Sequence, residues 1–290
     1  METNDSEHAV LLETERLLRY SLSDTICTPM KEGRISPNLP RLKQLVDLVK
    51  EIVFPGYYSE PKSESRASLA ELNGLLKEQI AHGLRFFAEQ AEGKTEADAP
   101  ELALAFMRRL FDVKRMLYTD VKAMFGNDPA ARSYGEVILC YPSIQAMIHY
   151  RIAHELLRLG IPVIPRIITE LAHSAIGIDI HPGAQIGEFF SIDHGTGVVI
   201  GETCIIGSHV HLYQGVTLGA RSFTFDERGH PLNVPRHPVI EDNVVIYSNS
   251  TILGRITIGH DSVIGGNVWL THSVPPQSRI IQYRASSNDS

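Results

Sequence analysis

The 290-residue sequence has few cysteines, no long hydrophobic run and no excess of basic residues. Its three cysteines, Cys27, Cys140 and Cys204, lie far apart and show no metal-ligand spacing, which is typical of a protein from a reducing compartment. No apolar stretch approaches the roughly 18 residues of a membrane-spanning helix, and residues 1–7 are polar and acidic, so no secretory signal is expected. The net charge of −7 argues against a nucleic-acid or anionic-membrane surface. We expect a cytoplasmic protein.

A six-residue spacing of branched aliphatic side chains is the main feature of the last two fifths of the sequence. Helices repeat apolar residues every three or four positions and half-buried strands every two, so neither produces this period. A parallel β-helix does, because each group of six supplies one short strand and one corner, and three groups complete a coil. The positions are Ile180, Ile186, Ile192 and Val198, then Ile200, Ile206, Leu212 and Leu218, then Ile240, Ile246, Ile252, Ile258, Ile264 and Leu270.

The sequence before this repeat is typical of helices. Residues 101–125 and 142–159 keep helical apolar spacing, and a further short helix is expected near 167–173. Helices followed by a β-helix place the sequence in the α+β fold class. Its composition, 43% hydrophobic and 21% charged residues, is that of an ordinary globular protein. We predict an α-helical N-terminal domain over 1–173, a left-handed parallel β-helix over 174–276 and a C-terminal tail over 277–290, of which 285–290 is expected to be disordered.

Two departures from the period draw attention to particular residues. The spacing slips by two between Val198 and Ile200, which predicts a bulge or a wide corner. Between Leu218 and Ile240 the spacing is 22 residues, which predicts a projecting loop over 220–238. Long loops in compact folds often carry function.

Three polar clusters lie near these departures: Asp179-Ile-His-Pro182, Asp193-His194 and Arg236-His237-Pro238. Histidine titrates near neutral pH, so His194 could take a proton from a hydroxyl group, and a carboxylate such as Asp179 could orient it. A single histidine at a corner is as often a solvated turn residue, but three clusters near one loop favour a site.

A metal site is not expected. His209 and His211 alternate on one predicted strand and would share a face, but no third ligand is apparent.

These motifs together resemble those of serine O-acetyltransferases, a family of hexapeptide-repeat acyltransferases. The resemblance covers residues from about Asp128 to Pro276. It is carried by the following segments: Asp128-Pro-Ala-Ala-Arg-Ser-Tyr134, Gln145-Ala-Met-Ile-His-Tyr-Arg-Ile-Ala-His154, Asp179-Ile-His-Pro-Gly183, Asp193-His-Gly-Thr-Gly-Val-Val-Ile-Gly-Glu-Thr203, Gln214-Gly-Val-Thr-Leu-Gly219 and Arg236-His-Pro238.

The resemblance implies a role for each matching residue. His194 would be the general base and Asp179 its orienting partner. Asp128 and Asp193 would hold the serine ammonium group, whereas Arg236 would take the carboxylate and His237 would complete the pocket. A zwitterionic amino acid requires such a combination of charges. Acetyl-CoA, the co-substrate, would lie between neighbouring subunits against four small residues: Gly219, Ala220, Ser248 and Gly266. No metal is implied.

The resemblance also implies partners. The family forms homotrimers or dimers of trimers, and cysteine is expected to inhibit by occupying the serine pocket. Many members bind O-acetylserine sulfhydrylase through a C-terminal isoleucine, but this sequence ends in Asn288-Asp-Ser290 and does not predict that complex.

Three alternatives remain open. A hexapeptide acetyltransferase acting on a sugar or an antibiotic would not need Arg236 with Asp128 and Asp193. A carbonic anhydrase on a β-helix would need two histidines five positions apart, a spacing that is absent after residue 173. A non-catalytic scaffold would have little reason to carry acids and histidines at the corners.

Overall fold

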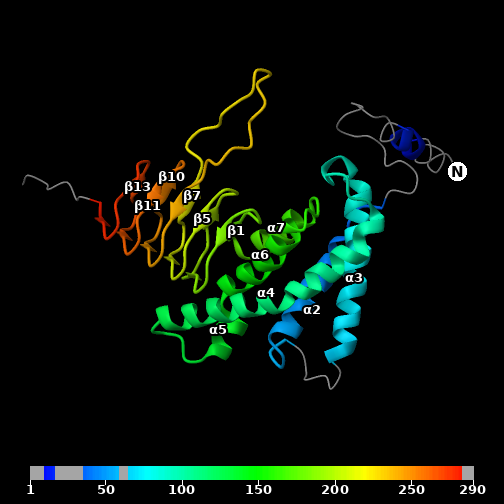
Figure 1. Ribbon diagram of the computed structural model, residues 1–290, viewed down its shortest axis with the longest axis horizontal. Helices are drawn as coiled ribbons and strands as arrows, with labels where there is room; N and C mark the ends of the chain where they lie inside the picture. Colours follow the sequence, from blue (N-terminus) through cyan, green and yellow to red (C-terminus); the bar gives the residue numbers. More distant parts are fainter. Residues whose placement is uncertain (1–9, 17–34, 59–64, 283–290) are drawn as a thin grey trace, which may run out of the picture. The chain divides into compact units, whose positions relative to one another are not determined.

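The computed structural model describes residues 10–16, 35–58 and 65–282. The chain forms two units, Met1–Ser36 and Pro37–Ser290, and in the first unit residues 10–16 form a helix. The second unit consists of helices followed by a parallel β-helix, as predicted (Figure 1). None of the helices in the described ranges is both long and apolar enough to cross a membrane. The predicted disorder of 285–290 lies outside the described residues.

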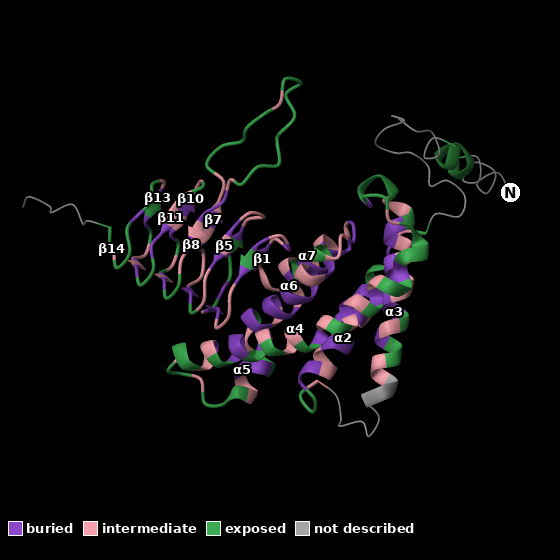
Figure 2. Ribbon diagram, in the orientation of Figure 1, coloured by how far each residue is buried: buried purple, intermediate pink, exposed green. Residues whose placement is uncertain are grey.

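The helices of the second unit pack around a buried apolar core (Figure 2). The long helices predicted near 101–125 and 142–159 are present as α4 and α6, and α7 includes the predicted short helix. Pro142 begins α6, and Gly177 ends α7 in the left-handed conformation that glycine favours. The helical elements are α2 (Leu39–Val53), α3 (Ser65–Phe86), η1 (Ala88–Gln90), η2 (Glu96–Asp98), α4 (Ala99–Asn127), α5 (Tyr134–Cys140), α6 (Pro142–Arg158) and α7 (Ile164–Ile176).

The β-helix has three parallel sheets, because every third strand from β1 to β13 lies in the same sheet, and β14 joins the sheet of β12. Sheet A contains β1 (Asp179–Ile180), β4 (Val199–Ile200), β7 (Thr217–Gly219), β10 (Thr251–Leu253) and β13 (Trp269–Leu270). Sheet B contains β2 (Gln185–Ile186), β5 (Ile205–Ile206), β8 (Val239–Ile240) and β11 (Thr257–Ile258). Sheet C contains β3 (Ser191–Ile192), β6 (His211–Leu212), β9 (Val245–Ile246), β12 (Val263–Ile264) and β14 (Arg279–Ile280).

The predicted aliphatic positions are all buried inside the three sheets. Val198 differs from the others, since it lies in the turn before β4, and Ile200 occupies the strand position. Cys204 is also fully buried, as expected of a residue in the wall. Strand β14 pairs with β12, so the β-helix continues past Pro276, where the tail was expected to begin. The expected boundary at residue 174 falls within α7.

A buried ion pair joins the helices to the first coil. Arg151 on α6 makes two hydrogen bonds to Asp120 on α4, of 3.0 and 3.1 Å, and donates to the backbone oxygens of Ile186 and Gly187. The Asp120 side chain is 0% exposed and that of Arg151 is 6% exposed. Both carboxylate oxygens of Asp120 and all three side-chain nitrogens of Arg151 therefore have a hydrogen-bond partner across the junction.

Replacing Asp120 with alanine should lower the free energy of unfolding by about 3–5 kcal/mol, because Arg151 would remain buried without its counter-ion. Urea denaturation measures this change. The control is Arg109→Ala, which breaks an ion pair to Glu155 between the same two helices at 3.8 Å, with 43% of the Arg109 side chain exposed. That change should cost at most about 1 kcal/mol. Equal effects of the two substitutions would contradict a structural role for the buried pair.

Candidate active site

The slip between Val198 and Ile200 corresponds to a wide corner in the structure. Ile180 pairs with Ile200, a step of twenty residues, whereas Ile200 pairs with Leu218 after eighteen. The extra residues lie between β3 and β4, where the chain passes from sheet C to sheet A, an edge that we call the C/A corner. A Cβ atom on Gly195 would lie 2.5 Å from Ile178 Cδ1, so only glycine fits there. His194 has a positive φ of 55° in this turn, and its side chain is 74% exposed.

Three of the predicted site residues meet at the C/A corner. Asp193 and His194 belong to the turn between β3 and β4, and Asp128 follows the end of α4. His194 Nε2 lies 3.8 Å from Asp193 Oδ2. Asp128 Oδ1 accepts a hydrogen bond of 2.8 Å from the Ala130 amide, and Oδ2 accepts one from the Tyr141 hydroxyl. These donors, with the nearby charge of His194, hold the pKa of Asp128 below its usual value. The carboxylate therefore stays ionised beside the exposed imidazole.

A chain of polar side chains leads from the exposed Asn127 to two buried residues behind this corner. Asn127 Nδ2 donates to Ser191 Oγ at 2.8 Å, and Ser191 Oγ lies 2.6 Å from His211 Nδ1. His211 Nε2 is buried without a hydrogen-bond partner. Burial lowers the pKa of His211, which favours the neutral ring. The expectation that His209 and His211 share a face of one strand is wrong, since His209 lies in the turn before β6, where its positive φ of 58° redirects it onto Phe189.

The projecting loop carries the second group of predicted residues. This loop leaves β7 at the A/B corner, where the chain passes from sheet A to sheet B, and it extends away from the β-helix (Figure 1). At its end, Arg236 Nη2 donates to Glu202 Oε2 at 2.6 Å, and Arg236 Nη1 donates to Asn233 Oδ1 at 3.1 Å. Thr203 Oγ1 accepts from the amides of both Arg236 and His237. The base of the loop is thus fixed to the coil below it.

His237 is held as a neutral ring with its Nδ1 atom as an acceptor. The Thr203 amide donates to His237 Nδ1 at 3.1 Å, so the ring proton belongs on Nε2. Burial and the positive charge of Arg236 lower the pKa of His237 to about 4. The ring packs against Gly201, where a Cβ atom would lie 2.2 Å from Nε2. His237 is therefore suited to donate a hydrogen bond from Nε2 and not to act as a base at neutral pH.

This low pKa makes the fold sensitive to acid. The pKa of His237 is 6.5, the ordinary value for histidine, in the unfolded chain and about 4 in the folded protein. Between pH 4 and pH 6.5 the unfolded chain therefore binds more protons than the folded protein. Stability should therefore fall as the pH is lowered from about 6.5 to about 4, and Tm measured against pH should show it. His237→Asn should make this slope shallower, whereas His230→Asn, at a 72% exposed side chain on the same loop, should not. Identical slopes for all three proteins would contradict the assignment.

Asp179 does not contact His194 within the described part of the chain. Its carboxylate lies near the ligand atoms of Glu170 and His173 on α7, all within 4.8 Å of one another. Glu170 is also paired with Arg166, so its charge is already balanced. The predicted orienting role of Asp179 thus stays a prediction.

The four residues predicted to line the acetyl-CoA groove lie at both corners. Gly219 ends β7 and Ala220 begins the loop at the A/B corner, whereas Ser248 and Gly266 occupy successive coils at the C/A corner. A Cβ atom on Gly266 would lie 3.3 Å from the Ser248 backbone oxygen. Small residues therefore keep this part of the C/A corner narrow.

The two groups of polar residues lie at opposite edges of sheet A. His194 precedes the sheet at the C/A corner, and Arg236 with His237 follows it at the A/B corner. One chain therefore does not bring the predicted base and the predicted carboxylate-binding arginine together.

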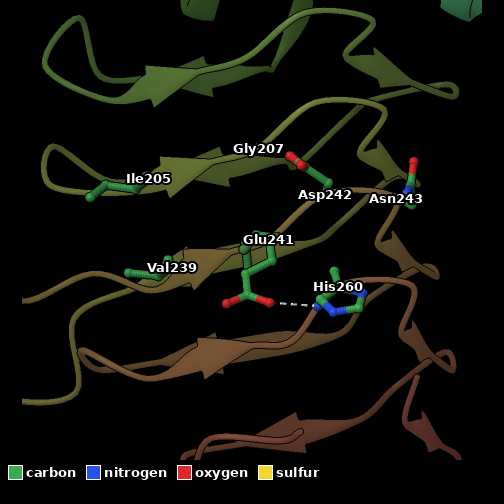
Figure 3. Close-up of a pocket in the computed structure, with 8 residues that line it drawn as sticks. Ile205, Gly207, Val239, Glu241, Asp242, Asn243 and His260 are labelled. Atoms are coloured by element: carbon green, nitrogen blue, oxygen red, sulfur yellow. Dashed lines mark hydrogen bonds between the residues drawn. The ribbon is translucent and has the colours of Figure 1, made fainter. Parts of the chain in front are cut away.

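A separate pocket of about 520 Å³ lies on sheet B and the turns that follow it (Figure 3). It is lined by Ile205, Gly207, Val239, Ile240, Glu241, Asp242, Asn243 and His260. The His260 amide donates to Glu241 Oε2 at 2.8 Å across it. None of the predicted site residues lines this pocket.

The sequence analysis missed three residues that contact the site. Tyr141 binds Asp128, Glu202 binds Arg236, and Thr203 binds both Arg236 and His237. Glu202 and Thr203 belong to the quoted segment Asp193–Thr203, and only their position one coil before the loop could have indicated contact. Nothing in the sequence pattern pointed to Tyr141, because its contact with Asp128 depends on how α5 and α6 pack.

Comparisons with known proteins agree on one family. Residues 237–272 match the family model "Bacterial transferase hexapeptide (six repeats)". The plasmid-encoded serine acetyltransferase of Synechococcus elongatus is 46% identical over 268 residues, which are 87% of this chain and 84% of that protein.

Solved structures give the same answer. Serine acetyltransferase 1 of Entamoeba histolytica, in complex with L-cysteine, is 33% identical with a TM-score of 0.72, over 92% of this chain and 94% of that one. Soybean serine acetyltransferase complexed with serine is 27% identical with a TM-score of 0.55, over 84% of this chain and 96% of that one.

Proposed function

Because the chain belongs to the serine acetyltransferase family, we propose that it transfers the acetyl group of acetyl-CoA to the hydroxyl of L-serine at a site between two copies. The products are O-acetyl-L-serine and CoA, which places the reaction in cysteine biosynthesis. The observation that carries the proposal is the C/A corner, where an exposed histidine lies beside two carboxylates on a β-helix of this family.

The proposed site takes one corner from each copy. Asp128 and Asp193 of one copy bind the serine ammonium, and Arg236 of the neighbouring copy binds the carboxylate. His237 of that neighbour completes the pocket, and its Nε2 proton suits a hydrogen bond to a substrate oxygen. The charges of the substrate and the site then match group by group.

The proposed reaction is direct acyl transfer in a ternary complex. His194 takes the proton of the serine hydroxyl while the hydroxyl oxygen attacks the thioester carbon, and Asp179 supports the imidazolium that forms. Backbone N–H groups stabilise the oxyanion. The CoA thiolate leaves as the tetrahedral intermediate collapses, and it takes up the proton. No covalent acetyl-enzyme and no metal take part in this scheme.

Acetyl-CoA is proposed to lie along the groove between copies, against Gly219, Ala220, Ser248 and Gly266. Small residues leave room there for the pantetheine arm. L-cysteine is proposed as a feedback inhibitor that occupies the serine pocket, which the cysteine-bound Entamoeba relative supports. The proposed assembly is a homotrimer or a dimer of trimers.

The experiment is to measure CoA release from acetyl-CoA with and without L-serine. Release that requires L-serine, with O-acetyl-L-serine detected by mass spectrometry, supports the proposal. Release that is independent of serine, or that depends on a sugar instead, would contradict it.

A further inference from the structure

Tyr141 occupies a fixed position beside the proposed ammonium site. It ends α5, where its amide donates to the Val137 oxygen at 3.2 Å, and it precedes Pro142 at the start of α6. The Ile144 amide donates to the Tyr141 oxygen at 3.2 Å. With its backbone held at both ends by helices, the phenol ring has little freedom to leave the C/A corner.

The hydroxyl of Tyr141 completes the coordination of one carboxylate. Asp128 Oδ2 accepts from this hydroxyl and Oδ1 accepts from the Ala130 amide, so each oxygen has one donor from the protein. Each oxygen keeps a further lone pair, because a carboxylate can accept about four hydrogen bonds. Two donors on opposite oxygens fix the plane of the carboxylate while leaving it able to bind a cation.

Asp128 and Asp193 both act on Tyr141 and on Tyr213, so both carboxylates face this part of the corner. Among the influences on Asp128, the hydrogen bond from the Tyr141 hydroxyl is the largest, and it lowers the pKa of the carboxyl group. A protonated Asp128 would bind an ammonium group weakly, so the site needs a donor that favours the ionised form.

We propose that Tyr141 is a positioning residue of the serine site, whose hydroxyl keeps Asp128 ionised and oriented to bind the substrate ammonium. This inference rests on the proposed function. Burial, and then Asp128, raise the pKa of Tyr141, so the phenol stays protonated and remains a donor throughout the working pH range. Tyr141 acts only through Asp128 and touches no reacting atom.

The test is Tyr141→Phe, which keeps the ring and the helix junction and removes only the hydroxyl. The KM for L-serine should rise about tenfold, as expected for loss of a hydrogen bond to a charged group, with kcat and the KM for acetyl-CoA little changed. The control is Tyr134→Phe. Tyr134 begins α5, packs its ring on Phe125 and makes no hydrogen bond through its hydroxyl within the described chain.

A double-mutant cycle separates positioning from a general structural effect. In an Asp128→Asn background, Tyr141→Phe should add little to the KM for L-serine, because the group through which it acts has been neutralised. Additive effects of the two substitutions would overturn the inference, as would an unchanged KM in Tyr141→Phe.

The pH profile gives a second readout. Removing the hydroxyl should raise the pKa of Asp128, so the calorimetric affinity for L-serine, which does not require His194 to act as a base, should begin to fall at a higher pH on the acid side. The titratable groups that face this pair are Asp193, His194, Glu136 and Tyr213, and the substitution leaves all four in place. An unshifted acid limb would overturn the inference.

Calorimetric binding of L-serine without acetyl-CoA separates the inference from the proposed function. If the native protein binds serine, Tyr141→Phe weakens binding about tenfold and no acetyl transfer occurs, the positioning role stands and the proposed function fails. If transfer occurs and Tyr141→Phe binds serine normally, the positioning role fails alone. If the native protein does not bind serine, both fail.

Discussion

Replacing His194 with alanine should lower kcat by about 10²–10⁴-fold, because general-base catalysis by a positioned side chain contributes about that factor. The imidazole lies exposed at the C/A corner and makes no hydrogen bond that the fold depends on within the described chain. Acetyl-CoA affinity should therefore be unchanged, which calorimetry can check. Steady-state kinetics with saturating L-serine gives kcat directly.

His209 provides a matched control for this substitution. It is also an exposed histidine at a corner of the β-helix, with a φ of 58° against 55° for His194. Alanine at either position meets the same backbone strain, so any difference in rate reflects the side chain. Near-normal turnover in His194→Ala, or an equal loss in His209→Ala, would contradict the assignment of the base.

Replacing Arg236 with alanine should raise the KM for L-serine about a hundredfold, since it removes a charged partner of the substrate carboxylate and leaves Glu202 unpaired. The KM for acetyl-CoA should change little. Arg228→Ala, an exposed arginine on the same loop, is the control and should retain normal kinetics. A KM for serine that is equal in Arg236→Ala and the native protein would remove Arg236 from the site.

The same variant tests whether copies share a site. His194 and Arg236 lie at opposite edges of sheet A, so each proposed site uses His194 of one copy and Arg236 of another. Co-expressing His194→Ala with Arg236→Ala should therefore restore part of the activity, because some sites combine an intact His194 with an intact Arg236. Sites built within one chain would each keep a defect, so the mixture would be no more active than the two variants measured separately.

The β-helix could be predicted because its signal is local and repeated. Each group of six residues must place one aliphatic side chain inside the coil, so Ile246, Ile252 and Ile258 are all fully buried. The two interruptions were equally visible, because a slip of two and a gap of 22 residues break an otherwise regular count. The boundaries were less accurate, since the strand β14 depends on pairing with β12 and not on its own sequence.

The sequence by itself determined the coil, its interruptions and the residue types that such chemistry needs. Only the tertiary structure decided how these residues are grouped. It placed Asp128 beside the wide corner through the packing of α4, gave that carboxylate a donor in Tyr141, and paired Arg236 with Glu202. The physical reason is that the six-residue repeat fixes where a side chain lies along and around the coil, whereas contacts between helices, loop and coil depend on residues distant in sequence.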